Sequence, residues 1–217
     1  MKNISRIFFI VFSSISFGAA QPRPFMFVFL NTNPNKPDLP KEQVDSLMSA
    51  HLANITRLAN EGKIIAAGPF YDGGGIFVMA TASKDTAWEW LKTDPAVRAN
   101  RWVLEIFPYQ PLRGSVCSVG ENYTMTTYNF VRYAVKEGAT SEESRRAWDA
   151  HDRYLRTFSP ADSVVAEGIL GNRQSSIFVY QGAAGEEFIK AEPTVREGAL
   201  HVTIRKIYIA KGSFCEK

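Results

Sequence analysis

The chain is poor in the residues that build metal and redox centres. Its 217 residues include only two cysteines and three histidines, and it has neither a C-x-x-C nor an H-E-x-x-H motif. A zinc or iron site of ordinary composition is therefore not expected. The phosphate-binding motifs G-x-G-x-x-G and G-x-x-x-x-G-K-S/T are missing as well, and no serine stands in a nucleophile-elbow context. We expect no metal and no cofactor, which leaves acid–base chemistry by side chains if the protein is an enzyme.

An excess of charge is also missing. Lys2 and Arg6 belong to the first twenty residues, and without them 23 basic residues stand against 22 acidic ones. A near-neutral chain without a basic cluster is a poor candidate for nucleic-acid binding. The expected partner is a small-molecule ligand.

The first twenty residues have the composition of a secretory signal peptide. Two basic residues precede the apolar run 7–12, and small residues come before Gln21. The run is too short to span a membrane. We expect residues 1–20 to be removed and the mature protein to be secreted or periplasmic, with no membrane insertion. The alternative is a buried N-terminal strand.

What the chain does contain is an internal repeat with a period of about one hundred residues. The segment around His51 returns around His151, and in each copy a glycine follows the histidine by seventeen residues. Asp94, which precedes a proline, corresponds to Glu192, which also precedes a proline. Self-similarity at a fixed period indicates a tandem duplication. The expected organisation is a first unit at 21–110, a linker at 111–123 and a second unit at 124–217.

Apolar periodicity and turn residues predict the order β-α-β-β-α-β in both units. In the first unit the strands are expected at 24–30, 63–70, 75–80 and 101–109, and the helices at 41–60 and 83–91. In the second unit the strands are expected at 126–135, 163–170, 175–180 and 200–210, and the helices at 141–158 and 185–191. The fold class is α+β, with two ferredoxin-like units that each leave one face of a four-stranded sheet bare. Two bare faces in one chain can cover each other.

The repeated histidines lie on the apolar faces of the expected helices. His51 follows Leu47 and Met48 by four and three residues, and His151 keeps the same spacing with Trp148 and Leu155. The apolar face of the first helix is expected to comprise Val44, Leu47, Met48, Leu52, Ile55, Leu58 and Ala59. A histidine beside a carboxylate suits acid–base catalysis, because the anion fixes the tautomer of a ring that titrates near neutral pH. The alternative is a core histidine satisfied by a hydrogen bond.

Each unit resembles the YciI-like (YCII-related) family. In the first unit the resemblance is carried by Ala50-His51-Leu52, Arg57-Leu58, Glu61-Gly62-Lys63, Ala67-Gly68-Pro69 and Asp94-Pro95. It implies ferredoxin-like units that pair sheet to sheet as a dimeric α+β barrel. This chain would then be a fused dimer, that is, a monomer acting as a pseudo-dimer. A higher oligomer is the alternative.

The resemblance further implies that His51 and Asp94 form an active-site pair. Asp94 has a second possible role, because an aspartate before a proline is a good N-cap. The second unit has Glu192 in place of the aspartate, so His151 and Glu192 are the less well preserved pair.

Two arginines and two cysteines also occupy matching places in the units. Arg98 and Arg196 are candidates for holding an anionic group, although surface arginines are more common. Cys117 and Cys215 each follow the last strand of a unit, and an even count in an exported protein suggests one disulfide between the units. Two free thiols are the alternative.

Three functions remain open from the sequence. The first is a cofactor-independent enzyme, an isomerase or lyase, in which His51 oriented by Asp94 acts on a small organic molecule. The second is a module that binds a small ligand without turnover, and the third is a structural scaffold whose histidines only pack.

Overall fold

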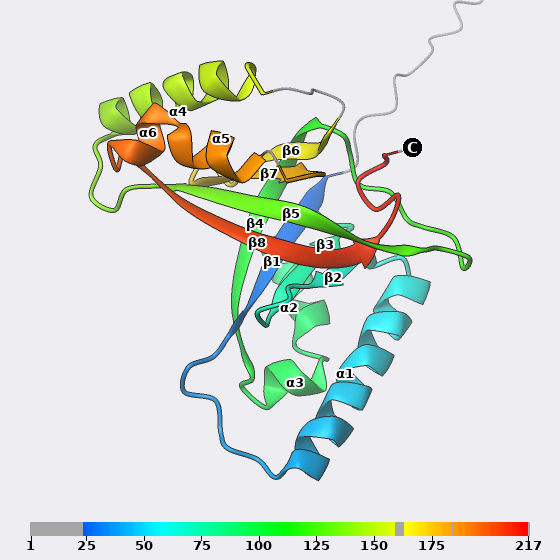
Figure 1. The fold of residues 1–217 in the computed structure, drawn as a ribbon. Coiled ribbons are helices and arrows are strands. Elements are labelled where there is room, and N and C mark those ends of the chain that lie inside the picture. Colours follow the sequence, from blue (N-terminus) through cyan, green and yellow to red (C-terminus); the bar gives the residue numbers. More distant parts are fainter. Residues whose placement is uncertain (1–23, 159–162, 184, 217) are drawn as a thin grey trace, which may run out of the picture.

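The computed structural model describes residues 24–158, 163–183 and 185–216. The predicted signal peptide, residues 1–20, lies outside the described residues. Among the described residues no helix is both long enough and apolar enough to cross a membrane. The described residues fold twice into the same order of elements, which confirms the predicted α+β class (Figure 1).

The two units contain corresponding strands and helices. The first comprises β1 (Phe25–Thr32), α1 (Lys41–Asn60), β2 (Ile64–Pro69), β3 (Gly75–Met79), α2 (Lys84–Leu91), α3 (Pro95–Arg98) and β4 (Trp102–Arg113). The second comprises β5 (Met125–Val135), α4 (Ser141–Leu155), β6 (Val164–Leu170), β7 (Ser175–Tyr180), α5 (Gly185–Ala191), α6 (Pro193–Arg196) and β8 (Leu200–Ala210).

All eight strands form one antiparallel sheet, in the order β2-β3-β1-β4-β6-β7-β5-β8. Each unit contributes the same internal order, and β4 of the first unit joins β6 of the second with Tyr109 opposite Leu170. The sheet then curls so that its edge strands β2 and β8 meet, through a bridge between Phe70 and Ile207. This is the fused dimeric α+β barrel expected from the sequence.

The two seams of the barrel differ in extent. The β4–β6 seam has four paired positions, whereas β2 and β8 share the single bridge. Pro69 lies next to that bridge and has no N–H to donate, so it cannot extend the ladder. Gly68 allows the close approach there, since a Cβ would lie 2.8 Å from the carbonyl oxygen of Tyr208.

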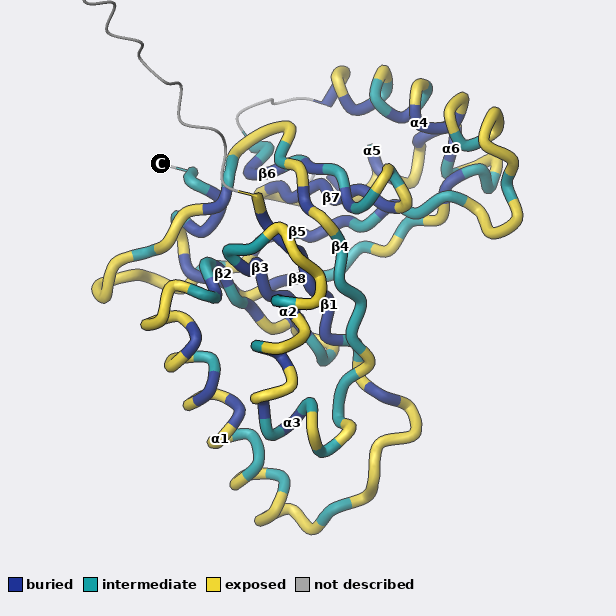
Figure 2. The backbone as a smooth tube through the Cα atoms, turned by 180° about the vertical axis from the view of Figure 1, so that it is seen from behind, coloured by how far each residue is buried: buried dark blue, intermediate teal, exposed yellow. Residues whose placement is uncertain are grey.

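The barrel interior is filled by aromatic side chains from both units. Phe27 contacts Phe29 and Tyr109 of its own unit and Phe130 of the other, with ring centroids 5.0 to 6.1 Å apart. The outer sheet faces are covered by α1–α3 on one side and α4–α6 on the other (Figure 1). Figure 2 shows the resulting pattern, in which buried residues concentrate on the strands and exposed ones on the outward helix surfaces. Each bare face is therefore buried against the other, as predicted.

Two element boundaries differ from the prediction by more than two residues. Strand β4 continues to Arg113 rather than ending at 109, because its last residues pair with β6 of the second unit. Helix α4 ends at Leu155 rather than 158. There the N–H groups of Thr157 and Phe158 bond to carbonyls three residues back, and Phe158 turns inward against Phe178.

A disulfide between Cys117 and Cys215 joins the segment after β4 to the segment after β8. The two segments also exchange backbone hydrogen bonds, from Ser115 N–H to Phe214 O and from Cys117 N–H to Ser213 O. Phe214 is fully buried in the barrel core. The disulfide thus fixes the chain segment that closes one end of the barrel, and it confirms the predicted pairing.

Candidate functional site

Helix α1 delivers His51 to the inside of the first unit. The buried residues of this helix are His51, Asn54 and Leu58, which follow one another at spacings of three and four. Leu52, which the apolar pattern placed on the buried face, is instead 61 % exposed. The prediction for Leu52 was wrong because the helix turns its polar pair, His51 and Asn54, toward a buried carboxylate rather than its leucine toward the sheet.

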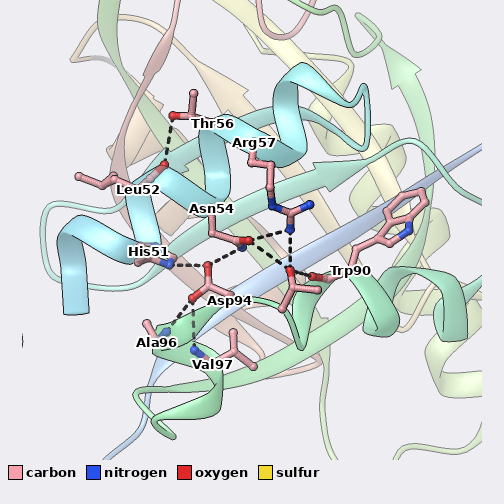
Figure 3. Close-up of polar contacts among 10 residues, drawn as sticks. His51, Leu52, Asn54, Thr56, Arg57, Trp90, Asp94, Ala96 and Val97 are labelled. Carbon is pink, nitrogen blue, oxygen red and sulfur yellow. Dashed lines mark hydrogen bonds and ion pairs between the residues drawn. The ribbon is translucent and has the colours of Figure 1, made fainter. Parts of the chain in front are cut away.

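That carboxylate is Asp94, at the N-terminus of α3. Its Oδ2 lies 2.8 Å from His51 Nδ1 and accepts a hydrogen bond from the Asn54 amide at 3.2 Å. Its Oδ1 accepts the backbone N–H groups of Ala96, at 2.8 Å, and Val97, at 3.3 Å (Figure 3). Asp94 therefore makes two sets of contacts at once, because one oxygen caps α3, as predicted, while the other bonds to the histidine.

These partners keep Asp94 ionised although it is almost fully buried. Burial by itself raises the pKa of this carboxyl, but the hydrogen bond and charge of His51 and the N–H groups of Ala96 and Asn54 outweigh it. The net pKa lies below the ordinary aspartate value. An ionised Oδ2 accepts hydrogen bonds only, so a neutral His51 carries its proton on Nδ1 and leaves Nε2 with a free lone pair.

A second layer of side chains holds the amide that supports Asp94. Asn54 Oδ1 accepts hydrogen bonds from the Arg57 guanidinium at 2.8 Å and from the Thr93 hydroxyl at 3.2 Å. Arg57 also bonds Glu61 at 2.7 Å. Sequence reasoning did not assign roles to these residues, although Asn54 and Arg57 follow His51 by three and six residues on one helix face and Thr93 precedes Asp94.

Two aromatic side chains lie near the His51 ring. Its centroid is 6.2 Å from that of Phe77, nearly stacked, and 6.0 Å from that of Trp102. Within the described residues, Nε2 makes no hydrogen bond, and the side chain is 8 % exposed. None of five hollows found on the described surface is lined by His51.

The second unit repeats the pair with different surroundings. His151 Nδ1 lies 2.9 Å from Glu192 Oε1, an oxygen that also accepts the Thr194 hydroxyl. Glu192 makes no capping hydrogen bond to α6. The opposite ring nitrogen, Nε2, faces the Ser176 hydroxyl at 3.5 Å. With its side chain only 2 % exposed, His151 is more deeply sealed than His51.

Side chains pack closely around this second pair, and two buried polar atoms there lack a hydrogen-bond partner among the described residues. The rings of Tyr133 and Trp148 pack edge-on against His151, with centroids 4.3 and 5.3 Å away. Glu192 Oε2 and the Tyr133 hydroxyl are buried without a partner among the described residues. Burial and the nearby Glu192 charge raise the pKa of Tyr133. The pair is thus sealed on every side that the described residues show.

The structure does not bring the two predicted arginines to the histidine pairs. Arg98 and Arg196 are exposed at the ends of α3 and α6. Neither forms a side-chain hydrogen bond or ion pair with another described residue, and an anion-binding role stays a prediction. No group of three metal-ligating side chains that could hold a metal ion occurs among the described residues either.

The chain is similar to known proteins at the level of family and fold. The model of the YCII-related domain matches residues 26–110, and no curated protein matches the chain. An anthrone oxidase-like protein of known structure is 12 % identical, with a TM-score of 0.52 over 87 % of this chain and 92 % of that one. A candidate monooxygenase from Fusobacterium nucleatum is 10 % identical, with a TM-score of 0.49 over 88 % and 94 %.

At these identities the likeness concerns the fold alone. The match to the family model, by contrast, spans β1 to β4 and includes His51 and Asp94. The YCII-related domain is thus matched by the first unit of the chain, over residues 26–110.

Proposed function

We propose that the first unit is an acid–base catalyst for a small organic molecule, in which His51 takes up and returns a proton through Nε2. The observation that carries the proposal is the asymmetry of the His51 ring. Nδ1 is held by a buried carboxylate, and Nε2 has no partner among the described residues. This is the arrangement of a general base with a fixed tautomer.

In the proposed reaction, Nε2 removes a proton from a carbon or oxygen of the substrate. The positive charge that develops on the ring is stabilised by Asp94, whose Oδ2 lies against Nδ1. Returning the proton to another atom completes an isomerisation, and loss of a leaving group completes an elimination. His51 performs every proton transfer, so no step needs a metal or a cofactor.

For the second unit we propose a structural role. A more sealed ring, a neighbouring hydroxyl at Nε2 and a carboxylate oxygen without a partner support packing rather than turnover. In this proposal the second pair stabilises the fold, while the first pair catalyses the reaction.

We also propose that the protein works as a monomeric pseudo-dimer outside the cytoplasm. The two units already form the barrel that separate subunits would build. The Cys117–Cys215 disulfide supports an oxidising compartment, since such bonds persist mainly in exported proteins.

The test is a search for carbon–hydrogen exchange in D₂O, using a panel of small acids and lactones followed by NMR. We expect at least one compound to exchange or isomerise with the wild type. The His51→Gln variant should be slower by about 10²- to 10⁴-fold, the usual contribution of a general acid–base group. The matched variant His151→Gln should retain the activity.

Two outcomes would overturn the proposal. Activity that survives in His51→Gln excludes the histidine as the base. Saturable binding of a panel member with no exchange or conversion would identify the first unit as a binding module instead.

A further inference from the structure

We propose a second ligand site in the second unit, specific for an uncharged molecule with a carbonyl oxygen. The site is a surface hollow of about 580 Å³ between α4 and the turn that joins β6 to β7. This volume is in the usual range for small-molecule sites. The hollow is distinct from both histidine pairs, since none of their members lines it.

Two side chains in its wall carry buried nitrogens without a partner among the described residues. They are the indole nitrogen of Trp148 and Nε of Arg173. Trp148 is only 3 % exposed, and a buried indole N–H normally finds an acceptor. Both nitrogens are donors and cannot accept, so the missing partner is an acceptor atom.

Arg173 is held in place at a conformational cost. Its φ of 58° lies in the left-handed region, which arginine seldom adopts. One terminal nitrogen contacts both oxygens of Asp152 at 2.8 Å, and the guanidinium lies 5.6 Å from the Trp148 ring centroid. The ion pair and the aromatic contact thus keep the guanidinium beside the indole.

The charges around the hollow favour a neutral ligand over an anion. Arg173 is already paired with Asp152, and Arg145 is paired with both Glu142 and Asp149. Both guanidinium groups that line the hollow are thus already neutralised by carboxylates, which leaves no unpaired positive charge to attract an acid. A carbonyl oxygen has two lone pairs and can accept from both unpartnered donors without adding charge.

For the ligand oxygen to reach these donors, the Arg173 side chain has to move. Both nitrogens are covered in the described structure, but the Arg173 side chain as a whole is 29 % exposed. The first unit cannot form such a site, because the residue one hundred positions before Trp148 is Met48 and the equivalent turn is Gly73-Gly74-Gly75.

The test is an NMR titration of the ¹⁵N-labelled indole groups with three matched probes: benzamide, benzoate and toluene. We expect benzamide to shift the Trp148 indole signal in a saturable way and to leave that of Trp88, an exposed tryptophan on α2, unchanged. Benzoate, which adds a charge, and toluene, which lacks an acceptor, should bind at least about tenfold more weakly. The Trp148 signal is assigned by its loss in Trp148→Phe.

Two variants of Arg173 and one control complete the test. Arg173→Gln and Arg173→Lys both remove Nε, and each should weaken benzamide binding by about three- to tenfold, the usual value of one hydrogen bond. The lysine variant keeps a positive charge near Asp152. A loss of affinity that occurs in Arg173→Gln but not in Arg173→Lys would therefore indicate a disrupted fold rather than the loss of Nε. Arg145→Gln, on the rim, should leave the affinity unchanged. The proposal is overturned if benzamide does not shift the Trp148 signal, if benzoate binds as tightly, or if neither Arg173 variant changes the affinity.

Discussion

Asp94 and Glu192 occupy equivalent positions and differ by one methylene group, yet they bind their surroundings differently. The shorter side chain reaches back to the N–H groups of Ala96 and Val97 with one oxygen and to His51 with the other. The longer one contacts His151 with a single oxygen, makes no cap and leaves the second oxygen buried without a partner among the described residues. At the scale of the residue, hydrogen bonds therefore stabilise the charge of the aspartate better than that of the glutamate.

This difference gives a testable pH dependence. The pKa of Asp94 is lower in the folded protein than in the unfolded chain. Its carboxylate therefore stabilises the fold above the ordinary aspartate pKa, and this stabilisation is lost as the pH falls through the folded value. We expect Asp94→Asn to lower the free energy of unfolding by about 1 to 3 kcal/mol at neutral pH. The deficit should shrink in acid.

The measurement is urea denaturation of both proteins at a series of pH values between neutral and strongly acidic. Asp45→Asn, which alters an exposed carboxylate on α1, provides the control and should follow the wild type closely. A deficit that stays constant into acid would show that the Asp94 charge contributes nothing.

At the scale of the element, the sequence predicts most of the architecture. The strand and helix order follows from apolar periodicity and turn residues, and the pairing of His51 with Asp94 follows from the family resemblance. The orientation of α1 about its own axis does not follow from the sequence, because successive residues of a helix point about 100° apart and a small rotation changes which side chains are buried. Only the position of the buried Asp94, which draws in His51 and Asn54, decides that Leu52 faces outward. The Arg57–Asn54–Thr93 network escaped prediction for the same reason.

A pair of leucine substitutions tests this rotation. Leu58 is buried in the core under α1, so Leu58→Ala should lower the free energy of unfolding by about 2 to 5 kcal/mol. Leu52 is exposed, so Leu52→Ala should change it by no more than about 0.5 kcal/mol. Chemical denaturation measures both. Equal losses would mean that α1 buries the face that its apolar pattern suggests.

At the scale of the whole molecule, the two units depend on each other. The barrel core mixes their aromatic side chains, and Arg132 of β5 makes a two-pronged ion pair with Glu105 of β4 at 2.7 and 2.8 Å. The Arg132 guanidinium also lies 4.2 Å from the centroid of the Phe29 ring. We therefore expect the chain to unfold as one cooperative body rather than as two separate units.

The disulfide adds to this unity by linking positions 98 residues apart. Constraining the unfolded chain in this way typically stabilises a protein by about 2 to 4 kcal/mol. The double variant Cys117→Ser/Cys215→Ser should lose stability of that order, measured by urea denaturation without reductant. The wild type in reductant serves as the matched comparison. No loss in either case would show that the burial of Phe214 holds the closing segment without the bond.

The most direct test of the central claim is the position of the proton on the neutral His51 ring. Two-bond ¹H–¹⁵N correlation spectra at a pH where imidazole is neutral distinguish the two ring nitrogens. The structure predicts a proton on Nδ1, bonded to Asp94, and a bare Nε2, with this preference lost in Asp94→Asn. A proton on Nε2 in the wild type would contradict the account, because His51 would then have no lone pair at the atom from which the proposed chemistry starts.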